Sequence, residues 1–207
     1  MNHTDLRIIM NKCIKFYSPY FKSEDDLLHF VNSCEILDGS VNKAKVMMHQ
    51  TQRLITAGDI MKGTDYDTDA MKLLFYIICT ETIAKLYRDM GSRKTKESKS
   101  YVYDFFNNWT SENDRDLLTK GFTYKYDKSL HFDEIIELLY QIRCDVVHEG
   151  RYWRFHFSQG CNHVINLVPK VEKLRPYSFV SISITIKDFR DVIVRNSIKM
   201  ITEKLYM

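Results

Sequence analysis

The chain has 207 residues, of which 44% are hydrophobic and 28% charged, a composition that suits a soluble protein with a real core. The formal charge of +3 is only mildly basic, so it permits a nucleic-acid partner without requiring one. The longest apolar run, residues 73–79, is far shorter than the roughly 20 residues that span a bilayer. These features argue against an integral membrane protein.

The cysteines are odd in number and irregular in spacing, at Cys13, Cys34, Cys79, Cys144 and Cys161. The first three lie inside helical apolar patterns, so we expect buried free thiols, as is typical of a reducing cytosol. The N-terminus lacks a basic segment followed by an apolar run, so we expect no signal peptide and a cytoplasmic location.

Two amphipathic helices are predicted first, over residues 4–18 and 24–37, with Thr4 and Ser23 as their caps. A longer helix follows over residues 41–62, with Ser40 as its cap.

The next predicted helix, residues 70–90, opens at Asp69 and is the most apolar in the chain. Its apolar residues cover most of its circumference, so it should be the central buried helix. Residues 101–109 form a short aromatic helix, whose rings either pack in the core or stack on bases.

The segment between these two helices, residues 91–100, is polar and basic. Arg93 and Lys94 within it are candidates for phosphate contacts with a nucleic acid. The alternative is an ordinary solvated loop.

Residues 132–150 carry the most informative pattern. Apolar residues at Ile135, Leu139, Ile142 and Val146 make the buried stripe of an amphipathic helix. Gly150 is a suitable left-handed stop for that helix.

After this helix the period of the pattern changes to two. Residues 152–158 and 179–186 each alternate apolar and polar side chains, which predicts strands, with residues 163–168 as a third strand between them. A final helix is predicted over residues 188–206.

The end of the 132–150 helix reads Arg143-Cys144-Asp145-Val146-Val147-His148, followed by Glu149-Gly150. This stretch resembles the Arg-x4–6-His signature of the HEPN superfamily, small helical proteins of which many are RNases. The family often has Asn directly after the Arg, where this chain has Cys144.

The resemblance implies a mainly α protein built as an antiparallel helical bundle. The period-two segments add a small antiparallel hairpin or three-stranded sheet inserted before the last helix, an order that is compatible with the family. We therefore interpret residues 1–39 as an N-terminal helical appendage. Residues 40–207 are then the HEPN-like domain, with the β insertion at about 152–186.

The resemblance also implies a metal-independent endoribonuclease that needs no cofactor. His148 can act as base or acid because its reference pKa of about 6.5 is near working pH. Arg143 carries a planar fork that suits phosphate. Asp145 can orient Arg143 or a water. Tyr140 can line the cleft.

Phosphate contacts beside the cleft are expected from Arg151 and Arg154. In this family two chains place their motif helices side by side, so we expect RNA as substrate and a homodimer. Many relatives act in toxin–antitoxin or antiphage defence systems, which implies an antitoxin or other inhibitory partner.

Other interpretations remain open. Arg143 could bridge Glu137 or Asp145, with His148 merely stabilised by the helix dipole. Cys144 favours a non-catalytic module that binds nucleotide, RNA or protein. A scaffold subunit is a third class. Cysteine and histidine at 144, 148, 161 and 163 are zinc-type ligands, but their spacing is not that of common fingers, so we expect no metal.

Overall fold

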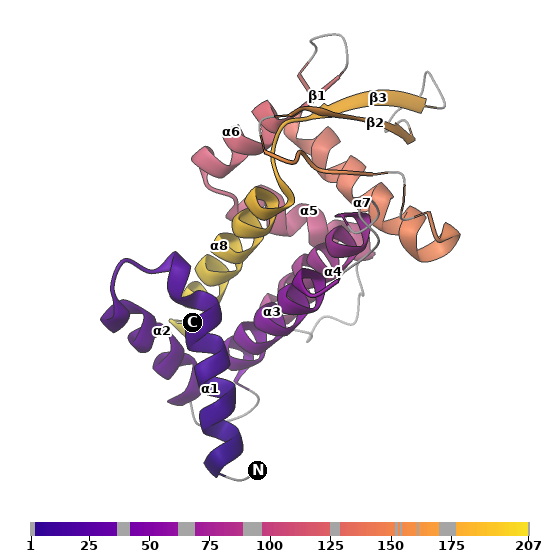
Figure 1. The fold of residues 1–207 in the computed structure, drawn as a ribbon. Coiled ribbons are helices and arrows are strands. Elements are labelled where there is room, and N and C mark those ends of the chain that lie inside the picture. Colours follow the sequence, from indigo (N-terminus) through magenta and orange to yellow (C-terminus); the bar gives the residue numbers. More distant parts are fainter. Residues whose placement is uncertain are drawn as a thin grey trace.

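The computed structural model describes residues 3–36, 42–61, 69–88, 97–124, 129–151, 153, 155–160, 162–169 and 177–206. Its helices are α1 (His3–Tyr17), the 3-10 helix η1 (Ser18–Tyr20), α2 (Glu24–Ile36), α3 (Lys43–Asp59), α4 (Asp69–Tyr87), α5 (Ser98–Trp109), α6 (Glu112–Gly121), α7 (Phe132–Glu149) and α8 (Ile186–Leu205). The strands are β1 (Phe122–Tyr124), β2 (Val164–Pro169) and β3 (Tyr177–Ile182) (Figure 1). The chain is mainly helical with a small three-stranded antiparallel sheet before the last helix, which confirms the predicted fold class.

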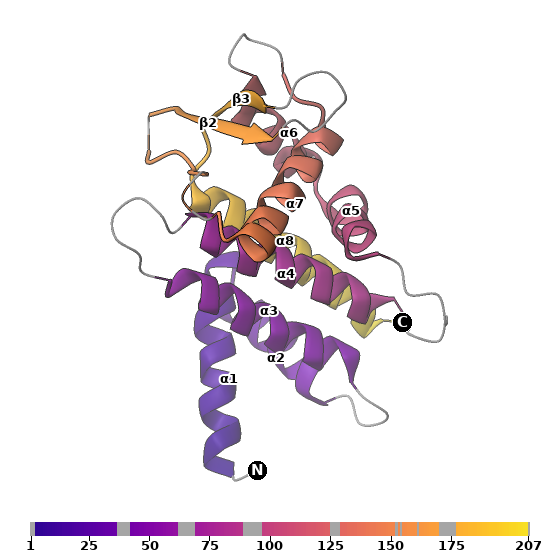
Figure 2. The ribbon, with the colours of Figure 1, turned by 90° about the vertical axis from the view of Figure 1, so that its right-hand side faces the viewer.

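Helix α4 is the centre of the bundle, as its composition predicts. It packs against α3, α5, α7 and α8, which surround it in both views (Figures 1 and 2). Leu73, Ile77 and Ile83 on it are fully buried. None of the described helices is long and apolar enough to cross a bilayer.

The N-terminal segment is tied to this bundle by two tyrosines. Tyr17, fully buried at the end of α1, donates a hydrogen bond to the Met48 carbonyl of α3 at 2.8 Å. The Tyr20 hydroxyl in η1 lies 2.5 Å from Asp191 Oδ1 on α8. The appendage is therefore packed on the helices that follow it.

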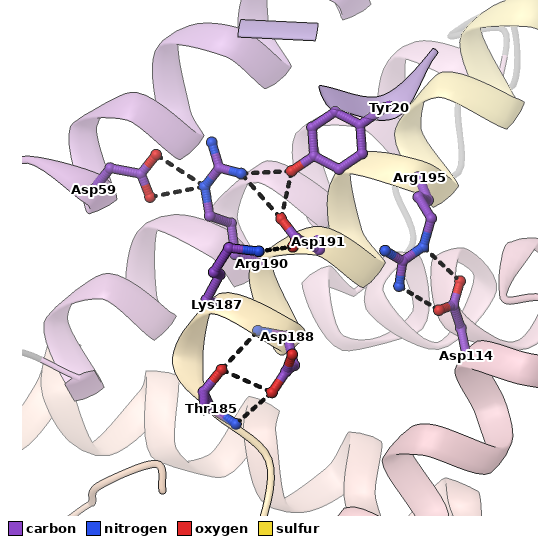
Figure 3. A network of polar contacts seen from close by, with 9 residues as sticks. All are labelled: Tyr20, Asp59, Asp114, Thr185, Lys187, Asp188, Arg190, Asp191 and Arg195. Atoms are coloured by element: carbon purple, nitrogen blue, oxygen red, sulfur yellow. Dashed lines mark hydrogen bonds and ion pairs between the residues drawn. The ribbon is translucent and has the colours of Figure 1, made fainter. Parts of the chain in front are cut away.

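Helix α8 carries the polar network that joins the outer helices (Figure 3). Arg190 donates from Nε to both oxygens of Asp59 on α3, at 3.0 and 2.9 Å. Its Nη1 lies 2.5 Å from the Tyr20 hydroxyl. Five residues further along α8, Arg195 pairs with the buried Asp114 of α6. Helix α8 thus binds α3 and η1 through Arg190 and α6 through Arg195, on different sides of the helix (Figure 3).

One of the predicted helix caps is confirmed, and the predictions for the other two helix starts need correction. Ser23 caps α2, accepting from Asp26 N at 3.1 Å. The predicted cap Ser40 lies outside the described residues, and α3 begins two residues later than expected with Asn42 as its cap. Helix α1 begins at His3, so Thr4 lies inside it rather than at its cap.

The sheet has the order β1-β3-β2, with both pairs antiparallel. The strand predicted at 163–168 is β2, but it lies at the edge, and β3 is central. Strand β1 was not predicted and comes before α7 in the chain. Two of the three strands therefore lie in the expected insertion.

The strand predicted at 152–158 is wrong: in the described part of that segment only Ser158 makes a bridge, to Thr185. Phe155 and Phe157 are buried, as their alternation indicates. The backbone of this segment instead makes hydrogen bonds with side chains from elsewhere in the chain. His156 exchanges hydrogen bonds with the Asn166 amide, and Phe157 N donates to Asp69 Oδ2 at 2.9 Å.

We expect Gly58→Ala to lower the free energy of unfolding by about 1–3 kcal/mol, although alanine favours helix by roughly 1 kcal/mol. A Cβ at this position would lie 2.7 Å from Tyr76 Cε1 and 3.3 Å from the Lys72 carbonyl. The Tyr76 ring is held by its hydrogen bond to Asp59 at 2.6 Å. Urea unfolding measures the change, and a stabilised variant would contradict close contact between α3 and α4.

Candidate functional site

Helix α7 has the predicted extent and the predicted buried face. Ile135, Leu139, Ile142 and Val146 are all buried, with at most 8% of their surface exposed. The helix begins where the Glu134 carboxylate accepts from His131 N at 2.8 Å. It ends at Gly150, whose φ of 64° is the left-handed conformation expected there.

Arg143 is turned toward α4 and is largely buried, with 17% of its side chain exposed. Its Nη2 lies 3.5 Å from Glu81 Oε2, and its guanidinium lies 5.7 Å from the centre of the Tyr140 ring. Its Nε is buried without a hydrogen-bond partner among the described residues. The Arg143 guanidinium is therefore held by a contact with α4, on the side of α7 that faces the core of the bundle.

The pairing with Glu81 corrects the structural alternative for Arg143. Glu137 instead accepts from Lys99 and from the Tyr103 hydroxyl, the latter at 2.7 Å. Asp145 accepts from the Gln141 amide at 2.9 Å, so its carboxylate is engaged along its own helix.

Glu81 is the acidic centre of this region, and 8% of its surface is exposed. One of its oxygens, Oε1, accepts from Lys85 Nζ and from Ser98 Oγ, both at 2.6 Å. Burial by itself raises the pKa of Glu81, but the hydrogen bonds from Lys85 and Ser98 and the charges of Lys85 and Arg143 outweigh it and lower the pKa. The carboxylate is thus ionised at neutral pH.

His148 lies in the last turn of α7 and is exposed. It makes no hydrogen bond or ion pair with any residue that the structure describes. The preceding residue, Val147, is 48% exposed although apolar. The imidazole is therefore free to meet a ligand or another chain.

Arg143 and His148 do not converge within one chain. Helix α7 remains α-helical through Glu149, so five residues separate the two side chains by about 140° around the axis and about 7.5 Å along it. The guanidinium faces α4, and the imidazole faces solvent. An arrangement that uses both groups on one phosphate requires a second chain or a large movement.

The structure describes only some of the other predicted site residues. Tyr140 is half-buried, and burial, followed by the neighbouring Cys144 thiol, raises the pKa of its hydroxyl. Arg151 lies next to the end of α7 and pairs with Glu149 at 2.6 Å. Three others, Arg93, Lys94 and Arg154, lie outside the described residues.

The zinc-type ligands are not brought together as a described cluster. Cys161 lies outside the described residues, and Cys144 is a free, half-buried thiol. Within the described ranges no three His, Cys, Asp or Glu side chains are grouped closely enough to hold a metal ion.

Comparison with models of known protein families, with curated proteins and with solved structures found no match to this chain.

Glu81, which pairs with Arg143, was not among the predicted site residues. Its signal was present: Glu81 is an acidic residue inside the most apolar helix of the chain, four residues before Lys85. An ionisable group on a helix that is buried on most sides needs a partner, which its own helix or a neighbouring one can supply.

We expect Glu81→Gln to lower the free energy of unfolding by about 1–3 kcal/mol, and to cost more than Arg143→Met. Losing Glu81 leaves Arg143 buried without its acidic partner, whereas losing Arg143 leaves Glu81 bound to Lys85 and Ser98. Urea unfolding of both variants measures the difference. Glu137→Gln is the matched control, since Glu137 also binds one lysine and one hydroxyl but no arginine, and equal costs for Glu81→Gln and Glu137→Gln would contradict the role of Arg143.

The lowered pKa of Glu81 also predicts a pH dependence. Its stabilisation is fully present above its usual pKa of 4.5 and is lost as the pH falls through the lower value in the folded state. The stability gap between the wild type and Glu81→Gln should therefore narrow between pH 5 and pH 3. Urea unfolding measures this difference in stability. A difference that stays constant between pH 5 and pH 3 would mean that the charge of the Glu81 carboxylate contributes nothing to stability.

Proposed function

We propose that this protein is a metal-independent endoribonuclease that acts as a homodimer, in keeping with the resemblance of residues 143–148 to the HEPN signature. The observation that carries the proposal is the free, exposed imidazole of His148 at the end of the helix that also holds Arg143. A nuclease needs a proton carrier that reaches the substrate and a cation whose position is fixed.

The reaction that these residues suit is an internal transesterification of RNA. A histidine takes the proton of the 2′-hydroxyl, and the 2′-oxygen then attacks the adjacent phosphorus. The bond from phosphorus to the 5′-oxygen breaks, and an acid protonates that oxygen as it leaves. The products are a 2′,3′-cyclic phosphate and a 5′-hydroxyl. Arg143 would stabilise the charge on the phosphate oxygens in the transition state.

In the proposed homodimer, the second chain supplies the second proton-transfer group that one chain lacks. The step needs both a base and an acid, and each chain contributes one His148. Two motif helices related by a two-fold axis would place two histidines and two arginines around one phosphate. In such a dimer the exposed Val147, next to His148, would lie at the contact between the two chains.

The setting and the neighbouring contacts follow from the same proposal. Arg151, whose partner Glu149 is an exposed residue on the same helix end, can exchange that ion pair for an RNA phosphate. By resemblance, the enzyme would act in a bacterial toxin–antitoxin or antiphage defence system in the cytoplasm, restrained by an antitoxin or inhibitory partner.

A non-catalytic binding module is the second candidate, and one observation favours it. Arg143 already has an acidic partner in Glu81 and is largely buried, so it can serve to position α7 without touching a substrate. The histidine would then contribute to binding RNA, nucleotide or a protein partner.

The test is cleavage of total RNA by the purified protein in EDTA. We expect discrete fragments from the wild type, with new 5′ ends that polynucleotide kinase labels without prior phosphatase treatment. His148→Ala should lower the rate at least about 100-fold, because it removes the proton carrier. Arg143→Lys should also lower it, because lysine keeps the charge but loses the planar fork.

His29→Ala is the matched control, since His29 is also an exposed helical histidine but lies on α2. Sedimentation should give a dimer that Val147→Asp weakens together with cleavage. Equal cleavage by the wild type and His148→Ala would overturn the mechanism. A stable dimer that binds RNA without cutting it would favour the binding module.

A further inference from the structure

A pocket of about 340 Å³ opens between α1, the end of α2 and α3, in the part of the chain to which the proposed nuclease gives no role. Its volume is in the range of small-molecule sites. The residues that line it are Ile9, Lys12, Glu35, Lys45, His49, Gln52 and Arg53.

The charged side chains in the lining are mostly cationic. Among the described lining residues, Lys12, Lys45 and Arg53 carry three positive charges, and Glu35 carries the one negative charge. Both oxygens of Glu35 are already engaged: Oε2 lies 2.5 Å from Lys45 Nζ, and Oε1 lies 2.7 Å from His49 Nε2. The formal charge of the described lining residues is therefore +2 with His49 counted as neutral, and Lys12 and Arg53 supply the excess.

Glu35 holds its neighbours in place rather than repelling an anion. Burial by itself raises the pKa of Glu35, but the hydrogen bonds and charges of Lys45 and His49 outweigh it and lower the pKa. The carboxylate is thus ionised and its charge is compensated. Lys45 is held at one side of the pocket as a result.

The other ring nitrogen of His49, Nδ1, contacts Cys13, whose Sγ lies at 3.4 Å. Cysteine, histidine and glutamate in a row resemble the arrangement of a nucleophilic site. Cys13, however, has no exposed surface, and burial together with the charge of Glu35 raises the pKa of its thiol to about 11. A buried, protonated thiol is a poor nucleophile, so the arrangement orients the imidazole for binding.

We propose that this pocket binds a small phosphate monoester. A phosphate monoester carries about −1.5 to −2 charges at pH 7, which matches the charge of the lining better than a monocarboxylate does. Lys12 and Arg53 are exposed at the pocket and can close on the phosphate, with Lys45 on the inner side. Gln52 offers an amide and Ile9 an apolar wall to the organic part of the ligand.

The experiment is titration calorimetry of the full chain with ribose 5-phosphate, inorganic phosphate and uncharged ribose in phosphate-free, low-salt buffer. We expect one saturable site per chain for ribose 5-phosphate, weaker binding of inorganic phosphate, and none of ribose. Lys12→Gln and Arg53→Gln should each weaken ribose 5-phosphate about tenfold or more, because each removes a charge-assisted hydrogen bond.

Lys120→Gln is the matched control, because Lys120 is an exposed lysine on α6 and its loss should leave the affinity unchanged. Both pocket variants replace exposed side chains, so their thermal unfolding without ligand should match the wild type. No binding of either phosphate at 10 mM would overturn the proposal, as would equal affinity in wild type, Lys12→Gln and Arg53→Gln. RNA cleavage by the same preparations is a separate readout, because the pocket shares no residue with the motif of α7.

Discussion

The arrangement of the motif helix depends on one carboxylate on the most buried helix. Helix α4 is apolar on nearly every side, and an ionised group on such a helix costs free energy unless it is paired. Glu81 meets this constraint by binding Lys85 on its own helix, Ser98 at the start of α5 and Arg143 on α7. The hydrogen bond to Ser98 and the ion pair with Arg143 thereby link α5 and α7 to the buried helix.

The second constraint is a pair of arginines on α8, which bind surrounding elements on different sides of that helix. Arg190 binds Asp59 and lies beside Tyr20, and Arg195 binds Asp114 (Figure 3). These contacts join segments that lie more than 80 residues apart in the chain. Because both arginines belong to one helix, the N-terminal segment, α3 and α6 all contact a common support.

Periodicity predicted the elements whose apolar face is continuous, which are α1 to α4, α7 and α8, and it identified α4 as central. It missed α6, a polar helix of ten residues, although Ser111 and Asp114 form a cap signal at its start. It placed a strand at 152–158 because Phe155 and Phe157 do point inward. The side chains of Asn166 and Asp69 bond the backbone of His156 and Phe157 in place of a neighbouring strand, and the local pattern holds no information on either.

The sequence predicted Arg143 and His148 as site residues of the proposed nuclease, but it did not predict which charged side chains lie around Arg143. Glu81 alone would cancel the positive field of Arg143 and weaken its hold on a phosphate. Lys85, at 2.6 Å from Glu81, compensates that carboxylate, so the three side chains together retain one positive charge. A phosphate arriving at α7 would therefore meet an arginine that is held in place yet not neutralised. His148 has no partner among the described residues, so in the proposed nuclease it would be free to move a proton. Because the regular helix separates it from Arg143, the proposed mechanism depends on a second chain to complete the site.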